Sequence, residues 1–315
     1  MKKIFLCAAA LVASYLAADA QFVVTPKAGE PVNVEGDVVF SESADGASWS
    51  VGTSYNSALD ISGIESISLA KGDGAKVGDF YYSDGTWSTE LDGTKTVVGV
   101  VFYVGDPGVD DEALRAAHPD CIHGLVVGLK QSQCEWQDDY SGFDDEADMT
   151  VGEWIEDNTD YVSIATRSES MSSVFNKIMG FNNTMGIDEF NESDYGWDYE
   201  VIVGSKVSTT MTGNDAPSIS SGWYVPSIKE VSLLCSGVTS ESIGDLGYED
   251  IPDNKNMELV NASLAKIEGA TLLGGVYWSS TEYTVSQVHT VQFARGIVMQ
   301  TSKGGTNLLR PVLAF

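Results

Sequence analysis

The sequence predicts an α+β fold, and about ninety residues at its C-terminal end supply the three main observations. A capped helix begins near Ser227, a strand follows at 277–280, and two more strands at 288–293 and 297–301 form a hairpin. Helices and antiparallel strands arranged in this order along the chain are typical of the α+β class.

The helix start is marked by Ser227-Ile228-Lys229-Glu230, which has the spacing of a capping box. In this motif the hydroxyl and the carboxylate each accept a hydrogen bond from a backbone N–H that the helix leaves unpaired. Pro226 favours an extended residue before it, so the helix begins after this position. Apolar residues then recur at helical spacing at Ile228, Val231, Leu234 and Cys235.

The hairpin strands are joined by Ala294-Arg295-Gly296, a short turn with glycine where a positive φ is favoured. A last strand is expected over Leu308–Phe315. Pro311 cannot donate a ladder hydrogen bond, so it predicts an edge position or a bulge in that strand.

Upstream, Asp84-Gly85 predicts the turn of a hairpin over 79–87. Apolar runs predict buried strands at 96–104 and 122–129. Charge order, periodicity and terminal glycines predict helices at 110–117, 168–179 and 256–268. Residues 181–221 are expected to be rich in loops, and long loops in a compact domain tend to be functional.

Several segments together resemble the Lcl C-terminal domain family and its relative, the major paralogous domain. The likeness spans roughly residues 77–315. The residues that carry it are Val77–Ser88, His123–Val127, Gly222–Ser227, Glu230, Tyr277–Glu282, Gly296, Lys303 and Arg310-Pro311-Val312. The resemblance implies a C-type lectin-like fold with two main helices, antiparallel sheets and long loops.

The expected domain organisation has three parts: a signal peptide at 1–20, a β-rich or extended lead-in at 21–71, and the lectin-like domain at 72–315. Lys2 and Lys3, an apolar run from Ile4 to Leu16, and Ala18-Asp19-Ala20 have the pattern of an export signal, with the mature chain starting at Gln21. We therefore expect a secreted, periplasmic or cell-surface protein that is not inserted in the membrane.

The chain is strongly acidic. Without Lys2, Lys3 and Asp19, its 17 basic and 46 acidic residues become 15 and 45, a formal net charge of −30. Such a surface repels nucleic acid and anionic membranes. We expect neither as a partner.

Three cysteines follow the expected cleavage site. In an oxidising compartment one disulfide is expected, and Cys121 with Cys134 closes a short loop around the strand that starts near His123. Cys235 lies on the apolar side of the capped helix and is expected to be a buried free thiol.

An acidic cluster at 138–148 raises the question of calcium, because hard cations take oxygen ligands. Its spacing lacks the D-x-[DN]-x-[DN]-G pattern of a calcium loop, and a charge run is usually a solvated face. The prediction is a solvated acidic loop and no metal or other cofactor.

The residues of the resemblance are expected to be structural: Trp223, Pro226, Glu230, Trp278, Glu282 and Arg310. A buried guanidinium needs a carboxylate. We expect Arg310 to form an ion pair with Glu230 or Glu282.

The hairpin is the candidate ligand-binding surface. Period-2 alternation places Val291 and Phe293 on one face and Thr290 and Gln292 on the other. The interleaving resembles the variable region of lectin-fold proteins that retroelements diversify, in which exposed residues change on a rigid scaffold. The candidate contacts are His289, Thr290, Gln292, Arg295, Met299 and Gln300.

Three functions remain open. The first is an exported, non-enzymatic lectin-like or adhesin-like protein that recognises a glycan or protein surface. The second is a structural or fimbria-associated cell-surface subunit. The third, for which no catalytic motif is found, is an enzyme of the formylglycine-generating fold type.

Overall fold

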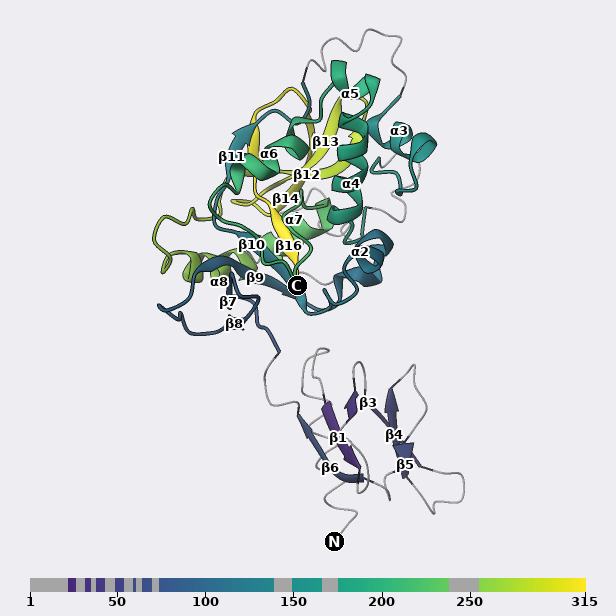
Figure 1. The fold of residues 1–315 in the computed structure, drawn as a ribbon, viewed down its shortest axis with the longest axis vertical. Helices are drawn as coiled ribbons and strands as arrows, with labels where there is room; N and C mark the ends of the chain where they lie inside the picture. Colours follow the sequence, from purple (N-terminus) through teal and green to yellow (C-terminus); the bar gives the residue numbers. More distant parts are fainter. Residues whose placement is uncertain are drawn as a thin grey trace. The chain divides into compact units, whose positions relative to one another are not determined.

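The structure, a computed structural model, describes residues 74–138, 149–165, 175–237 and 255–315, together with the backbone of six strands between residues 22 and 69. The chain divides into two compact units, Met1–Gly74 and Ala75–Phe315 (Figure 1). The expected signal peptide lies outside the described residues.

The N-terminal unit contains two three-stranded antiparallel sheets, with strand orders β2-β1-β6 and β3-β4-β5. The strands are β1 (Phe22–Pro26), β2 (Val32–Val34), β3 (Val38–Glu42), β4 (Trp49–Thr53), β5 (Leu59–Asp60) and β6 (Ile64–Leu69). The apolar residues Val38, Val39 and Phe40 lie in β3, and Ile64–Leu69 forms β6.

The C-terminal unit has an α+β fold with two five-stranded sheets. The first has the order β16-β10-β9-β7-β8, and all its neighbouring strands are antiparallel. The second has the order β11-β15-β12-β13-β14 and is antiparallel except between β12 and β15. The strands are β7 (Phe80–Tyr82), β8 (Trp87–Ser88), β9 (Val97–Val104), β10 (Gly124–Gly128), β11 (Ser132–Cys134), β12 (Val276–Thr284), β13 (Gln287–Gln292), β14 (Ile297–Ser302), β15 (Asn307–Leu309) and β16 (Val312–Ala314).

The capped helix is α7 (Ile228–Ser236), which contacts strands of both sheets and packs against α8 (Lys255–Leu264). Its capping box is confirmed, because Ser227 Oγ accepts from the Glu230 N–H and the Glu230 carboxylate accepts from the Ser227 N–H. Every residue of α7 is buried. A helix buried on all sides forms part of the core rather than its cover.

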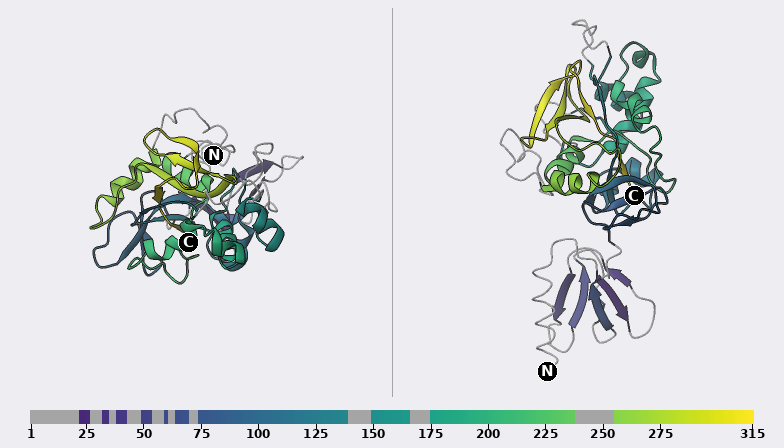
Figure 2. Two further views of the ribbon diagram at one scale, coloured as in Figure 1. Left: turned by 90° about the horizontal axis from the view of Figure 1, so that it is seen from above. Right: turned by 90° about the vertical axis from the view of Figure 1, so that its left-hand side faces the viewer.

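Helices also flank strands β12–β14, and α4 contacts β12 directly (Figures 1 and 2). The remaining helices are η2 (Pro107–Val109), α2 (Glu112–Ala117), α3 (Val151–Asn158), α4 (Gly180–Asn191), α5 (Asp194–Asp198) and α6 (Ile202–Thr210).

The single strand expected over Leu308–Phe315 is wrong. It is two strands, β15 and β16, which belong to different sheets. Arg310 and Pro311 form the crossing, and the Pro311 carbonyl accepts from the Gly128 N–H at 3.0 Å. Pro311 therefore interrupts the strand pairing where the chain changes sheet, which agrees with its missing N–H group.

Two further expectations are wrong around Gly180. Residues 168–174 of the helix expected at 168–179 lie outside the described part, and residues 175–179 are not helical. Gly180 begins α4 instead of ending a helix. A Cβ at Gly180 would clash with the Glu230 carboxylate, so its lack of a side chain serves close packing rather than termination.

The expected loop region at 181–221 contains α4, α5 and α6. Helix α4 is polar by sequence, yet Asn182 and Asn183 are buried and hydrogen-bonded to other segments, such as Asn183 to Ser280 at 3.0 Å. Hydrogen bonds from distant segments thus allow a helix that has little apolar periodicity.

Candidate functional site

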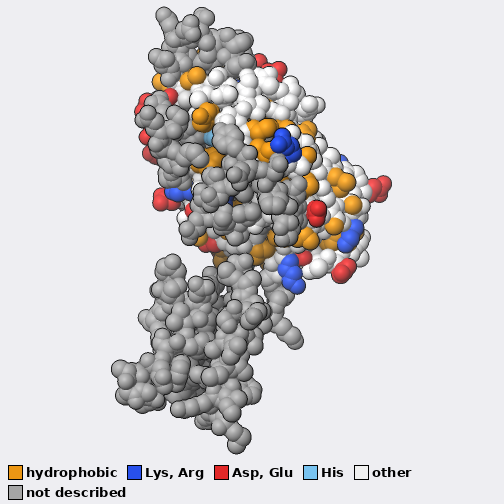
Figure 3. Space-filling view, turned by 180° about the vertical axis from the view of Figure 1, so that it is seen from behind, with side chains coloured by type: hydrophobic (Ala, Val, Ile, Leu, Met, Phe, Trp, Pro, Cys, Tyr) orange, Lys and Arg blue, Asp and Glu red, His pale blue; other side chains and the backbone are white. Residues whose placement is uncertain are grey.

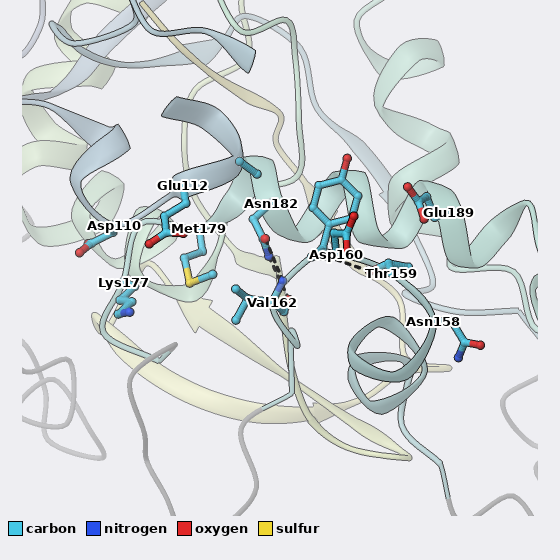
Figure 4. Close-up of a pocket in the computed structure, with 12 residues that line it drawn as sticks. Asp110, Glu112, Asn158, Thr159, Asp160, Val162, Lys177, Met179, Asn182 and Glu189 are labelled. Atoms are coloured by element: carbon cyan, nitrogen blue, oxygen red, sulfur yellow. Dashed lines mark hydrogen bonds between the residues drawn. The ribbon is translucent and has the colours of Figure 1, made fainter. Parts of the chain in front are cut away.

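A hollow of about 810 Å³ opens between the start of α2, the end of α3 and the start of α4 (Figure 4). Most charged groups around it are carboxylates, with one lysine among them: Asp110, Glu112, Asp160, Glu189 and Lys177. Asn182, Met179 and Val162 complete the inner wall.

Hydrogen bonds fix the walls of this hollow. The Asp111 side chain caps α2 by accepting from the Leu114 N–H at 2.9 Å, and it also accepts from the Asn182 N–H at 2.9 Å. The Asn182 side chain accepts from the Val162 N–H at 3.1 Å and donates to the Val162 carbonyl at 3.0 Å (Figure 4). Asp110 accepts from the Ile178 N–H at 3.0 Å. Three segments that are distant in sequence thus form one rigid rim.

The electrostatics of this hollow are those of crowded carboxylates. Burial raises the pKa of Asp111. Burial, and then the charges of Glu189, Asp188 and Asp160, raise the pKa of Tyr161. The site therefore disfavours anions and suits cationic or hydroxyl-rich ligands.

No sequence pattern marks this site, because its residues come from segments that meet only in the fold. Among the described residues, no group of three or more His, Cys, Asp or Glu side chains could hold a metal ion. Asp138 is exposed, and residues 139–148 of the acidic cluster lie outside the described part.

The candidate residues of the hairpin do not form one surface. His289 and Thr290 are buried, which corrects their assignment to a ligand-contacting face. Strand β13 is paired on both sides, and Phe175 and Tyr283 pack on the His289 ring. Val291 and Phe293 are also buried, so the predicted alternation of a buried and an open face is wrong for Thr290.

The other candidates remain accessible. Arg295 is exposed beside Gly296, whose φ of 61° confirms the turn glycine. Gln292, Met299 and Gln300 are half-buried. Contact of these four residues with a ligand stays a prediction.

The two tryptophans that were expected to be structural, Trp223 and Trp278, hold neighbouring segments in place. Trp278 is buried and its indole N–H donates to the Cys134 carbonyl at 2.9 Å. Trp223 is half-buried and donates to the Asn214 carbonyl at 2.7 Å. Pro226 accepts from the Ser280 N–H at 2.8 Å.

The two glutamates of the resemblance interact with different partners. Glu230 accepts from the Tyr224 hydroxyl at 2.8 Å in addition to its capping contacts. Glu282 forms an ion pair with Lys303.

The expected ion pair of Arg310 with Glu230 or Glu282 is wrong. Arg310 is buried, but it donates to the Thr271 carbonyl at 2.9 Å and to Gln131 Oε1 at 3.3 Å. Within the described ranges it contacts no carboxylate. Burial lowers its pKa to about 10.

The expected disulfide is also wrong. Cys121 and Cys134 are buried thiols with no disulfide bond between them. Cys121 packs in the core cluster around α7, whereas Cys134 ends β11 and packs in a second cluster with Trp136 and Trp278. Proximity in sequence did not bring the two sulfurs together, because β10 and β11 belong to different sheets.

On the face seen in Figure 3, the described Lys and Arg side chains lie apart from one another among apolar and acidic ones. Among the helices that the structure describes, none has the length and apolar character of a membrane span.

Comparison with known proteins gives two likenesses. No family model matches the chain. A Bacteroides ovatus protein named as a fimbrium tip subunit, Fim1C, is 25% identical over 70% of this chain. The crystal structure of a fimbrial protein from Bacteroides ovatus has a TM-score of 0.60, with 20% identity over 95% of this chain. The chain spans 41% of the first protein and 65% of the second, so these are likenesses to parts of longer proteins.

Proposed function

We propose that the protein is a subunit of a bacterial surface fimbrium, of the kind found at or near the tip. The observation that carries this proposal is the likeness to a solved fimbrial protein over 95% of the chain, which includes residues of both units. The sequence likeness to a named fimbrium tip subunit supports the same assignment. These findings favour the fimbrial alternative over a free lectin-like protein.

The chemistry of the described residues supports a binding or structural role. Burial raises the pKa of the Cys121 and Cys134 thiols to about 11 and that of Cys235 to about 12, so none is a ready nucleophile. His118 packs on Phe181, far along the chain from the enclosed His289. These three thiols and these two imidazole rings are thus used for packing.

The proposal includes export to the cell surface, in agreement with the pattern of residues 1–20. It also includes a C-type lectin-like fold for the C-terminal unit. Support for that fold comes from the resemblance to the Lcl C-terminal domain, whose signature residues Glu230, Trp278 and Glu282 are all fully buried.

The test is to shear surface fibres from the source bacterium and to identify the proteins in the purified fibres by mass spectrometry. The protein should copurify with the fibres, and antibodies against it should label fibre ends in electron micrographs. A strain that lacks the gene is the control for labelling. Recovery of the protein only from the periplasm or the culture medium would contradict the proposal.

A further inference from the structure

A second hollow, of about 560 Å³, lies where α4, α5 and α6 meet. One wall is the Trp197 ring, and the side chain is 88% exposed. Around it are three carboxylates and one hydroxyl, from Asp188, Glu192, Glu200 and Ser205. This hollow is distinct from the one in Figure 4, which lies toward α2 and α3.

Trp197 is exposed on a fixed backbone. The Ser193 side chain caps α5 by accepting from the Gly196 N–H at 3.1 Å, and the Trp197 N–H donates to the Ser193 carbonyl at 3.1 Å. A Cβ at Gly196 would clash with the Phe190 carbonyl, so the glycine lets α5 lie directly on the end of α4. The Trp197 ring therefore projects from a segment whose backbone is fixed by hydrogen bonds and by close packing on α4.

Hydrogen bonds and close packing also fix the wall of the hollow opposite Trp197. The Asn191 side chain accepts from the Val201 N–H at 2.8 Å and donates to its carbonyl at 3.1 Å. The Glu200 carbonyl accepts from the Asp138 N–H at 2.8 Å. Gly204 allows α6 to approach Ile187 of α4 closely. The hollow is thus preformed, which reduces the entropy lost on binding.

The charges in this hollow are unbalanced. Asp188 of α4 and Glu192, the residue that caps the C-terminal end of α4, are four residues apart, a like-charge spacing that destabilises a helix. None of the ion pairs between described residues involves these carboxylates or Glu200, and the lining contains no lysine or arginine. A cation that entered would relieve this repulsion.

We propose that this hollow binds an arginine side chain of a partner protein. A guanidinium is planar and cationic, and it carries only donors, which matches carboxylate acceptors beside a flat aromatic wall. It stacks on tryptophan more favourably than on other rings. The acidic chain as a whole attracts a basic partner surface toward the site. This inference does not depend on the fimbrial assignment.

The test uses the full chain with ¹⁵N-labelled tryptophan indoles, titrated at low salt with the tripeptide acetyl-Gly-Arg-Gly-amide. The indole resonance that is missing from the NMR spectrum of Trp197→Ala is assigned to Trp197. In the wild-type protein this resonance should shift when the arginine peptide is added. In Trp197→Ala, binding measured by calorimetry should weaken about fivefold. Asp188→Asn should weaken it by about twofold to fivefold.

The matched control is Tyr195→Ala, because Tyr195 is exposed on the same helix but does not line the hollow. Its affinity for the peptide should equal that of the wild type. The proposal is overturned if the arginine peptide leaves the Trp197 signal unmoved, if Trp197→Ala binds it equally well, or if lactose shifts the signal and the peptide does not.

Discussion

The Lys303 ammonium group lies against the Glu282 carboxylate, and both side chains are fully buried. The carboxylate also accepts from the N–H groups of Val151 at 3.2 Å and Gly152 at 2.8 Å, at the start of α3. Lys303 donates to the Gln137 side chain at 2.9 Å and lies 4.8 Å from the centroid of the Trp136 ring. This ion pair and its neighbours thus join four parts of the chain: strand β12, the residue after β14, the segment that follows β11, and the start of α3.

Breaking this pair should be costly. In Lys303→Met the Glu282 carboxylate stays buried without its cation, so unfolding should require about 3–5 kcal/mol less free energy. The measurement is chemical unfolding followed by circular dichroism. Lys95→Met is the control, because the Lys95–Asp84 pair is accessible to solvent and should contribute little to stability. Equal stability of the two variants would show that the buried pair contributes no more than a surface pair.

Glu230 should make the protein less stable as pH rises. Burial raises its pKa from 4.5 to about 7 in the folded state. Between these values the folded state binds more protons than the unfolded state, so stability falls as pH rises through this window. Glu230→Gln has no such proton and should gain on the order of 3 kcal/mol relative to wild type from below pH 4.5 to above pH 7. Parallel curves of stability against pH for the two proteins would contradict this prediction.

His289 should make the protein less stable as pH falls. Burial lowers its pKa from 6.5 to about 4, so the unfolded state binds more protons between these values. Stability from this group is present above pH 6.5 and is lost as pH falls toward 4. His289→Gln should therefore lose less stability than wild type on acidification, by on the order of 3 kcal/mol. Thermal melting at a series of pH values measures it, and an unchanged acid limb would show that His289 titrates normally.

Arg310 should tolerate an apolar replacement better than Lys303 does. Its guanidinium is buried with neutral acceptors and no carboxylate among the described residues. Arg310→Met removes a charge without leaving an opposite charge unpaired, so the free energy of unfolding should stay within about 1 kcal/mol of wild type. Gln131 keeps a donor, the Tyr277 hydroxyl at 2.8 Å. Destabilisation equal to that of Lys303→Met would reveal a counter-charge.

Cys121, Cys134 and Cys235 should all be reduced and shielded. Their raised pKa values and burial predict no reaction with a thiol reagent in the native protein. After unfolding in guanidinium without reductant, all three should react. Mass spectrometry of alkylated peptides assigns them, and an unmodified Cys121 or Cys134 under these conditions would restore the disulfide prediction.

The sequence alone predicted local structure correctly where the stabilising interactions join residues that are close together in the chain. The capping box of Ser227 and Glu230 spans three residues, and the turns at Gly85 and Gly296 depend on a local positive φ. Helix α3 was not predicted, although the capping box of Thr150 and Glu153 at its start is present in the sequence, because an acidic run surrounds it. Sequence patterns therefore predicted the α+β class and most strands of the C-terminal unit.

Tertiary structure decided the features that depend on distant partners. The split of the last strand at Arg310-Pro311 follows from pairing β15 with one sheet and β16 with the other. The choice of Lys303 rather than Arg310 as partner of Glu282, and the burial of Thr290, depend on segments that meet only in the fold. Both hollows likewise combine side chains from separate helices and loops. Hydrogen bonds and charges act over a few ångströms of space, and one-dimensional periodicity carries no record of which distant segments come that close.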